Sequence, residues 1–353
     1  MAGSEWFGSR PGGLNRYFSE LYRALAAQDG VEVDAVAFGQ ASKGGKSWGP
    51  VGLPLLLRVG KATVDGRFSD VVDRHFSLYG RVRGLPRPRA RTLSVVHFHG
   101  PWASESAVSG GGSLSNKLKR VIEVSRYAKA DVIVVLSEAF KELLIGEYSV
   151  PADKIRVIPP GVRQPVQVAE VARERHPVVL CVRRLEKRMG IDVLLDAWGM
   201  VHARFPDAEL RVIGGGSEDQ ALRSKARTLG LEGSVHFLGK ISDEQLTAEY
   251  ARCAMTVVPT RALEGFGLIA LESLAHGKAP VVTDCGGLPD SVRDLDPTLI
   301  VAPSSPAELA ERIETGLAGQ LPTSDECREH AARFTWDRAA KAHLALYEEL
   351  IAS

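Results

Sequence analysis

The sequence predicts an α/β protein with two domains, each built on a parallel β-sheet. Its 353 residues suit two domains of about 150–200 residues better than one core. In the second half of the chain, short apolar strands alternate with amphipathic helices, which is typical of a parallel sheet covered on both faces. Hydrophobic residues make up 44% and charged residues 25% of the chain, as in an ordinary globular protein.

Charge and cysteine usage exclude several classes of function. Lys plus Arg number 44 and Asp plus Glu number 43, so no excess of positive charge indicates nucleic-acid binding. The four cysteines are widely scattered without a Cys-x-x-Cys pair, and they indicate neither a zinc site nor a disulfide framework. No apolar run approaches ~18 residues, and the N-terminus lacks the features of a signal peptide. We therefore expect a cytoplasmic protein.

The first domain is expected to span residues 1–165. Residues 1–10 contain no strand-like run, and Pro11-Gly12-Gly13 then precedes an amphipathic helix. Strands are expected at residues 31–38, 69–72, 95–98, 131–136 and 155–158, and Ser137 is expected to cap a helix that begins at Glu138. Residues 39–50 and 107–115 are expected to form loops, because they are rich in glycine and serine.

A basic segment without acidic residues lies between two of these strands. Its five arginines are Arg81, Arg83, Arg87, Arg89 and Arg91. Most such runs are solvated loops, but this one also fits an anionic acceptor or a membrane surface. Peripheral association with a membrane therefore stays open.

The second domain is expected to span residues 175–335. Strands are expected at 178–182, 209–213, 235–238, 254–258, 280–283 and 299–301. Helices are expected near 190–204, 218–229, 243–252, 267–276 and 306–317, and a last amphipathic helix lies within 336–353.

The stretch from 264 to 282 carries the strongest functional signal. Glu264 and Glu272 stand eight positions apart, and between them Gly265-Phe266-Gly267 opens into an apolar helix that begins near Leu268. Backbone N–H groups at such a helix start form an anion site, most simply a phosphate site. A carboxylate in so apolar a helix indicates a polar ligand, such as ribose hydroxyls. The alternatives are a simple tight turn and an ion pair of Glu272 with an arginine.

The core Glu-Gly-Phe-Gly-Leu, followed by Glu272-Ser-Leu-Ala-x-Gly-x-x-Pro-Val-Val, resembles the family 4 retaining glycosyltransferases. The resemblance continues over nearly the whole chain. It implies the GT-B fold, in which two Rossmann-like domains with parallel sheets face a central cleft and the last helix returns to the first domain. It also implies transfer of a sugar from a nucleoside diphosphate sugar, most simply UDP- or GDP-linked, to a hydroxyl of a glycan, lipid-linked or small-molecule acceptor. No metal and no other cofactor is implied.

The resemblance assigns roles to residues of the first domain. His99 follows the strand at 95–98 and matches a family histidine beside the reacting sugar, at the strand end where parallel sheets bind ligands. Gly12 and Gly13 match the loop that approaches the diphosphate of the sugar donor. The family has a buried strand before this loop, and here that strand is expected to be missing or truncated.

In the second domain the family shows Gly-Arg-Leu…Lys-Gly, with the two cations on the phosphates of the sugar donor. Arg184 matches the family arginine, whereas Met189 stands in the lysine position, so Arg188 is expected to supply the second cation. Glu264 is expected to hold hydroxyls of the donor sugar, and Glu272 those of the ribose.

Backbone groups complete the site that the resemblance implies. The amides of Phe266, Gly267 and Leu268 are expected to meet the diphosphate. Gly215 lies in a turn near the sugar donor, and Leu238 lies in a segment that touches the base.

Three alternatives remain open. Asp294-Leu295-Asp296 has the Asp-x-Asp form that binds metal in another glycosyltransferase fold, but it lies in a late loop, which disfavours that role. The chain could be a GT-B nucleotide-sugar epimerase. The altered lysine and the missing strand also fit a non-catalytic nucleotide-sugar binding protein.

Overall fold

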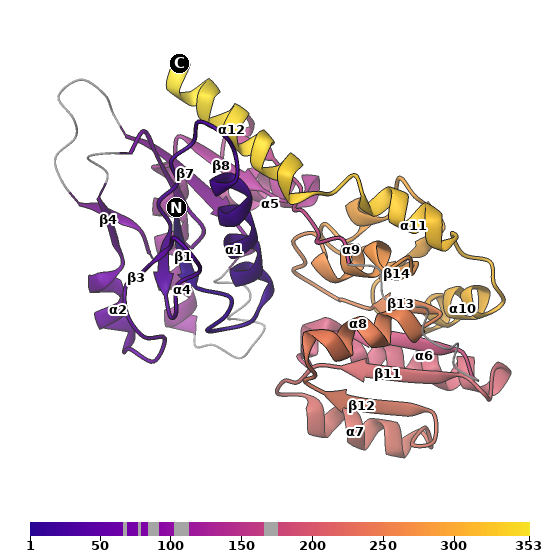
Figure 1. The fold of residues 1–353 in the computed structure, drawn as a ribbon. Coiled ribbons are helices and arrows are strands. Elements are labelled where there is room, and N and C mark those ends of the chain that lie inside the picture. Colours follow the sequence, from indigo (N-terminus) through magenta and orange to yellow (C-terminus); the bar gives the residue numbers. More distant parts are fainter. Residues whose placement is uncertain (66–68, 77–78, 84–91, 102–112, 166–175) are drawn as a thin grey trace. The chain divides into compact units, whose positions relative to one another are not determined.

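A computed structural model describes residues 1–65, 69–76, 79–83, 92–101, 113–165 and 176–353 (Figure 1). The chain divides into two compact units. The first consists of Met1–Gly161 together with Thr335–Ser353, and the second is Val162–Phe334. The basic segment lies partly outside this description: Arg81 is exposed on the strand β6 (Arg81–Arg83) and Arg83 ends that strand, whereas Arg87, Arg89 and Arg91 lie outside the described residues.

The first unit is built on a seven-stranded parallel sheet with the strand order β3-β2-β1-β5-β7-β8-β9. Its strands are β1 (Ala2–Glu5), β2 (Val36–Phe38), β3 (Lys46–Ser47), β5 (Val71–Arg74), β7 (Leu93–Phe98), β8 (Val132–Val135) and β9 (Ile155–Val157). A separate parallel pair joins β4 (Thr63–Asp65) to β6 (Arg81–Arg83). The helices are α1 (Gly13–Ala26), α2 (Leu55–Lys61), α4 (Ser113–Ala128), α5 (Glu138–Tyr148), the short η1 (Ala152–Lys154) and α12 (Trp336–Ala352).

The first strand is present, and the expectation that it is missing or truncated was wrong. All four residues of β1 are buried, and β1 pairs in parallel with β2 on one side and β5 on the other. The sequence hid this strand because Ala2-Gly3-Ser4-Glu5 contains no β-branched or aromatic residue. Tertiary context decides instead: a Cβ at Gly3 would lie 2.6 Å from the ring of Phe18, so only glycine lets α1 approach the sheet here.

Gly3→Ala is therefore expected to destabilise the protein by about 1–3 kcal/mol through overpacking against Phe18. Gly8→Ala is the matched control, because a Cβ at Gly8 would meet nothing within 4 Å. Thermal unfolding of the two variants measures the difference. A melting temperature of Gly3→Ala equal to that of the control would contradict this account of β1.

Other differences from the predicted elements are local. The strand expected at 31–38 begins only at Val36, and the loop expected at 39–50 contains the short β3. Helix α4 begins at Ser113, inside the expected glycine-rich loop, and α2 was not predicted. Helix α2 buries none of its residues. Its three leucines, Leu55–Leu57, are consecutive and exposed, so its sequence does not show the spacing of an amphipathic helix.

The second unit holds a six-stranded parallel sheet with the order β12-β11-β10-β13-β14-β15. Its strands are β10 (Val178–Val182), β11 (Glu209–Ile213), β12 (Val235–Gly239), β13 (Met255–Val258), β14 (Pro280–Thr283) and β15 (Ile300–Val301). Its helices are α6 (Ile191–Arg204), α7 (Asp219–Thr228), α8 (Asp243–Arg252), α9 (Leu268–Ala275), α10 (Pro306–Leu317) and α11 (Ser324–Ala331). Single turns form η2 (Lys187–Met189), η3 (Pro289–Ser291) and η4 (Pro297–Leu299). Apart from α11 and these turns, the elements follow the predicted alternation closely.

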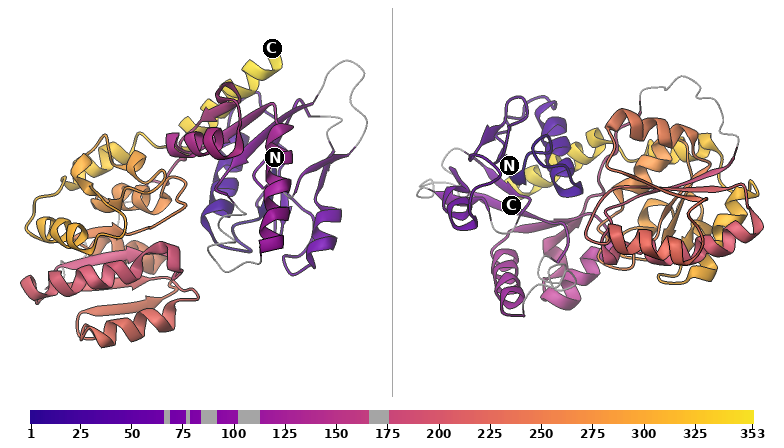
Figure 2. Two further views of the ribbon diagram at one scale, coloured as in Figure 1. Left: turned by 180° about the vertical axis from the view of Figure 1, so that it is seen from behind. Right: turned by 90° about the horizontal axis from the view of Figure 1, so that it is seen from below.

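Helix α12 packs on the first unit, although it follows the second in sequence (Figures 1 and 2). Leu346 joins a core cluster with Val95, Val132 and Val134 of the sheet. The unit's fold therefore depends on the last residues of the chain. Among the described residues, no helix is both long enough and apolar enough to cross a membrane.

Candidate functional site

The second sheet reverses its strand order between β10 and β13. From β10 the chain continues to β11 on one side, whereas β13 lies on the other side of β10. Ligands of open α/β sheets bind at the carboxyl ends of the strands at such a reversal. Arg183 directly follows β10, and Thr260 and Glu264 follow β13. The sheet thus brings these three residues to the place where a ligand is expected.

The side chains of Arg183 and Glu264 form an ion pair at this point. Arg183 Nη2 donates to Glu264 Oε2 at 2.5 Å and to Thr260 Oγ1 at 2.6 Å. Burial alone would raise the pKa of Glu264, but Arg183, with smaller contributions from Arg188 and Arg184, holds it below its usual value. Glu264 is therefore ionised at neutral pH. The sequence analysis assigned a role to Arg184 but none to Arg183. Arg183 stands where the family's Gly-Arg-Leu motif has glycine, and this departure could have indicated it.

The other two arginines of this segment differ in their surroundings. Arg184 is exposed, and among the described residues the structure gives its side chain no hydrogen bond. Arg188 Nη1 donates to the carbonyl oxygen of Leu263 at 2.8 Å and to that of Ala262 at 3.3 Å. Arg188 thus ties η2 to the residues immediately before Glu264.

The backbone of Glu264 is held by the loop that follows β14. The amide of Gly287 donates to the carbonyl oxygen of Glu264 at 2.9 Å. Gly286 has a φ of +56°, and a Cβ there would lie 2.1 Å from that same oxygen. Only glycine fits this conformation and this close approach. Glu264 is consequently fixed through both its main chain and its side chain.

Helix α9 begins at Leu268, directly after the glycine turn. Gly267 precedes it with a φ of +81°, and the first amides of a helix have no partner within it. The side chain of Phe266 is buried against Phe334, with ring centroids 5.6 Å apart, so only its backbone remains available to a ligand. Leu268 and Glu272 are half-buried and, four residues apart, share one face of the helix.

Gly215 and Leu238 lie at the same edge of the sheet. The carbonyl oxygen of Gly215 accepts from the amide of Leu185 at 3.1 Å, which packs the glycine turn after β11 against the arginine segment. Leu238 is exposed near the end of β12.

The Asp-x-Asp motif is engaged elsewhere. Asp294 pairs with Arg333 at 2.9 Å, and Asp296 pairs with Arg312 at 3.2 Å. Asp296 Oδ1 also accepts from the amide of Thr298 and caps η4. Both carboxylates therefore serve the fold, and their arrangement does not favour a metal site.

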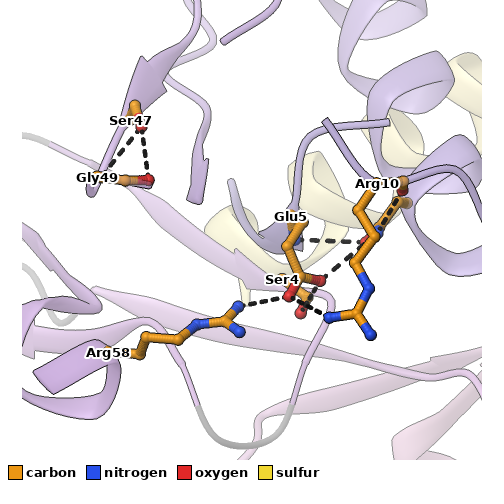
Figure 3. Close-up of polar contacts among 7 residues, drawn as sticks. Ser4, Glu5, Arg10, Ser47, Gly49 and Arg58 are labelled. Carbon is orange, nitrogen blue, oxygen red and sulfur yellow. Dashed lines mark hydrogen bonds and ion pairs between the residues drawn. The ribbon is translucent and has the colours of Figure 1, made fainter. Parts of the chain in front are cut away.

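The first sheet has its own reversal, between β1 and β5. Glu5 ends β1 and is buried, and it gathers Arg58 at 2.5 Å, Ser4 at 2.6 Å and Arg10 at 3.4 Å around its carboxylate (Figure 3). Burial would raise the pKa of Glu5, but the hydroxyl of Ser4 and the guanidinium of Arg58 lower it overall. The sequence analysis missed this cluster because it did not recognise β1. Gly12 and Gly13 follow it, exposed, at the start of α1.

His99 lies at the end of β7, beside a buried group of polar rings. Its Nε2 is 3.4 Å from His75 Nδ1. Asp73 Oδ2 lies 3.2 Å from His97 Nε2 and accepts a bond of 2.5 Å from the hydroxyl of Tyr347 on α12. Desolvation, together with the neighbouring His75 and His97, holds the pKa of His99 well below its usual value. His99 is thus neutral and able to bind a hydroxyl.

Three histidines of this group bring ring nitrogens within 4.8 Å of one another: His75, His97 and His99. Their rings are nearly parallel, with interplanar angles of 16–23°. A bound metal lies close to the plane of each imidazole that holds it, and nearly parallel rings do not direct their nitrogens to one point. The geometry therefore favours a stacked cluster over a metal site.

The buried histidines predict how stability depends on pH. Burial lowers the pKa of His97 and of His343 to about 4, whereas both titrate near ~6.5 in the unfolded chain. Between these values the unfolded chain binds more protons, so the free energy of unfolding falls as the pH drops from ~6.5 to ~4. The loss is on the order of 3 kcal/mol for each histidine, at 1.36 kcal/mol per pKa unit. Asp73, whose pKa is held low by His97 and His75 against its burial, acts in the same direction at lower pH.

Urea unfolding at pH 7, 6 and 5 measures this dependence. His343→Leu should flatten it in part, because it removes one of the buried histidines whose pKa is lowered. His236→Gln is the control, since His236 is partly exposed on β12. Stability that is independent of pH in this range would contradict the assignment of two neutral, buried histidines.

Comparison with known families assigns both units to one group of enzymes. Residues 163–334 match the family described as glycosyl transferases group 1, and residues 11–164 match glycosyltransferase family 4. D-inositol 3-phosphate glycosyltransferase of Acidothermus cellulolyticus is 29% identical, over 97% of this chain and 86% of that one. The enzyme of the same name from Corynebacterium jeikeium is 30% identical, over 81% and 74%.

Solved structures agree on the fold. Sucrose-phosphate synthase from Thermosynechococcus elongatus has a TM-score of 0.76 at 22% identity, over 100% of this chain and 96% of that one. HepE of Anabaena, solved in complex with UDP, has a TM-score of 0.72 at 19% identity, over 97% of each chain.

Proposed function

Because the chain belongs to glycosyltransferase family 4 and has the GT-B fold, we propose that it transfers a sugar from a nucleoside diphosphate sugar to a hydroxyl of an acceptor, with retention of the anomeric configuration. The observation that carries this proposal is the ionised Glu264, fixed among three arginines at the reversal of the second sheet. Cations aimed at a departing diphosphate stabilise the charge that develops on it.

The leaving group defines the roles of the cations. As the bond from the anomeric carbon to the diphosphate oxygen breaks, Arg184 and Arg188 neutralise the charge that grows on the phosphates. The amides from Phe266 to Leu268 and the Gly12-Gly13 turn add further donors. The acceptor hydroxyl attacks the same face of the sugar, and its proton passes to the departing diphosphate oxygen. No metal or other cofactor is proposed.

The remaining residues hold the sugar donor. Glu264 and His99 bind hydroxyls of the donor sugar, and Glu272 binds the ribose. The backbone at Gly215 and Leu238 meets the base. UDP is the first nucleotide to test, since the HepE structure was solved with it, and D-inositol 3-phosphate is the first acceptor, since the relatives are named for it.

A thermal-shift screen of UDP-, GDP- and dTDP-sugars, followed by a transfer assay with and without EDTA, tests the proposal. Selective binding raises the melting temperature, and transfer should continue in EDTA. Epimerised free donor in the absence of acceptor would indicate an epimerase. Binding without transfer to any acceptor and without hydrolysis would indicate a non-catalytic nucleotide-sugar binding protein.

Glu272→Ala is expected to weaken binding of the free nucleotide, because the proposed bonds to the ribose exist without the sugar. Losing a hydrogen bond to a charged group costs ~1.5–3 kcal/mol, which corresponds to roughly a 10- to 150-fold higher Kd for UDP. Calorimetry measures it, with Glu232→Ala as an exposed control. Wild-type affinity in a folded Glu272→Ala variant would end the ribose assignment.

A further inference from the structure

Arg183 carries a buried charge that the roles above leave unexplained. Its side chain is only 7% exposed, and its Nε is buried without a hydrogen-bond partner among the described residues. Burying a guanidinium is costly unless a carboxylate compensates it. Glu264, 17% exposed, is that carboxylate. A buried arginine at the reversal of the strand order therefore indicates a functional role at this site.

The guanidinium of Arg183 also fills the space at the tip of residue 189. Arg183 Nη2 lies 2.9 Å from Met189 Sδ. A lysine at this position would carry its ammonium two bonds beyond the atom equivalent to Sδ, roughly 2.5 Å away by standard bond lengths. Arg183 Nη2 lies at a similar distance from Sδ. A lysine ammonium at position 189 would therefore reach the region that the Arg183 guanidinium occupies, where two like charges disfavour each other.

We propose that Arg183 is the positioning residue of this site: it holds the carboxylate of Glu264 for the sugar donor, and it takes the place that a lysine side chain at position 189 would occupy. The inference rests on the proposed function and deepens it.

The contacts explain what this arrangement does for Glu264. The bond to Arg183 uses Oε2, which leaves Oε1 to accept from a hydroxyl of the donor sugar. Thr260 shares the same Nη2 and fixes the guanidinium from the end of β13. Since Gly287 holds the backbone of Glu264, the carboxylate can neither rotate away nor exchange its partner without breaking a buried bond.

The first test compares kcat and KM of wild type, Arg183→Met, Arg183→Lys, Arg183→Gly and the exchange variant Arg183→Gly/Met189→Lys, with UDP-glucose and GDP-mannose as probes. Arg183→Met should lower kcat about 10²-fold, as expected for loss of one preorganised charged group, and leave the Kd for UDP within a few-fold. Arg183→Lys should retain part of the activity. The exchange variant should recover most of what Arg183→Gly alone loses.

The acid limb of the pH–rate profile gives a readout that a purely structural role would not move. Without the neighbouring cation, Glu264 holds its proton to higher pH, so the limb should shift to higher pH in Arg183→Met and return in the exchange variant. Arg211→Met is the matched control, because Arg211 pairs with Glu209 and Glu249 in the middle of the same sheet. It should leave kcat and the profile unchanged.

A double-mutant cycle of Arg183→Met and Glu264→Gln, read as melting temperatures, tests the pair without any activity. Strong coupling between the two changes supports the inference, and additive effects overturn it. An unchanged kcat and pH profile in Arg183→Met would overturn it as well. If the wild-type protein transfers no sugar to any acceptor, the proposed function is wrong. The double-mutant cycle still shows whether Arg183 and Glu264 interact, because it does not depend on activity.

Discussion

Arg188→Ala is expected to lower kcat about 10²–10³-fold, the effect typical of removing one preorganised charge-stabilising group. Arg188 stands one residue before the methionine that replaces the family lysine, and it contributes to the low pKa of Glu264. It also binds the carbonyl oxygens of Ala262 and Leu263. Its loss therefore removes positive charge from the diphosphate site and loosens the segment that leads to Glu264.

Lys187→Ala is the matched control, because Lys187 belongs to the same turn and is exposed. It should stay within a few-fold of wild type. Arg188→Lys separates the two contributions, since it keeps the charge but offers a point charge in place of a planar fork. Equally mild effects of Arg188→Ala and Lys187→Ala would mean that neither residue binds the phosphates, and that this role falls to Arg184.

Glu264→Gln is expected to reduce both turnover and stability. The amide keeps the shape of the side chain but removes the charge, so Arg183 is left buried without its counter-ion. Breaking a buried pair in this way costs about 3–5 kcal/mol. Loss of a charged bond to the sugar, which costs ~1.5–3 kcal/mol, lowers kcat by roughly 10- to 150-fold. Binding of free UDP should remain near wild type, because UDP lacks the sugar.

Steady-state kinetics, UDP calorimetry and thermal unfolding measure the three effects. Glu349→Gln is a suitable control, since the side chains of Glu349 and its partner Arg156 are 60% and 37% exposed. His99→Ala should resemble Glu264→Gln in kinetics and leave UDP binding intact. We assign Glu264 and His99 to the sugar and Glu272 to the nucleotide. This assignment is wrong if Glu264→Gln or His99→Ala loses as much affinity for UDP as Glu272→Ala.

The second unit could be predicted in detail because its signals are local. Its central strand Val178–Val182 is a run of apolar residues, and the turn that follows carries charge. Glu264, Gly267 and Glu272 were recognisable because their spacing lies within one turn and one helix. Gly286 and Gly287 contact the backbone of Glu264 from the loop after β14. No local pattern in the sequence predicts this contact.

The sequence by itself determined the fold class, the family and the residues of the E-x7-E segment, because periodicity and motif spacing are properties of neighbouring residues. Only the tertiary structure decided that Ala2–Glu5 is a strand, since its burial comes from β2, β5 and Phe18. It also decided that Arg183, and not its neighbour, meets Glu264 across 81 positions of chain. The reason is physical: distance and burial in the packed protein decide which two residues form a buried ion pair, and the local sequence reveals neither of them.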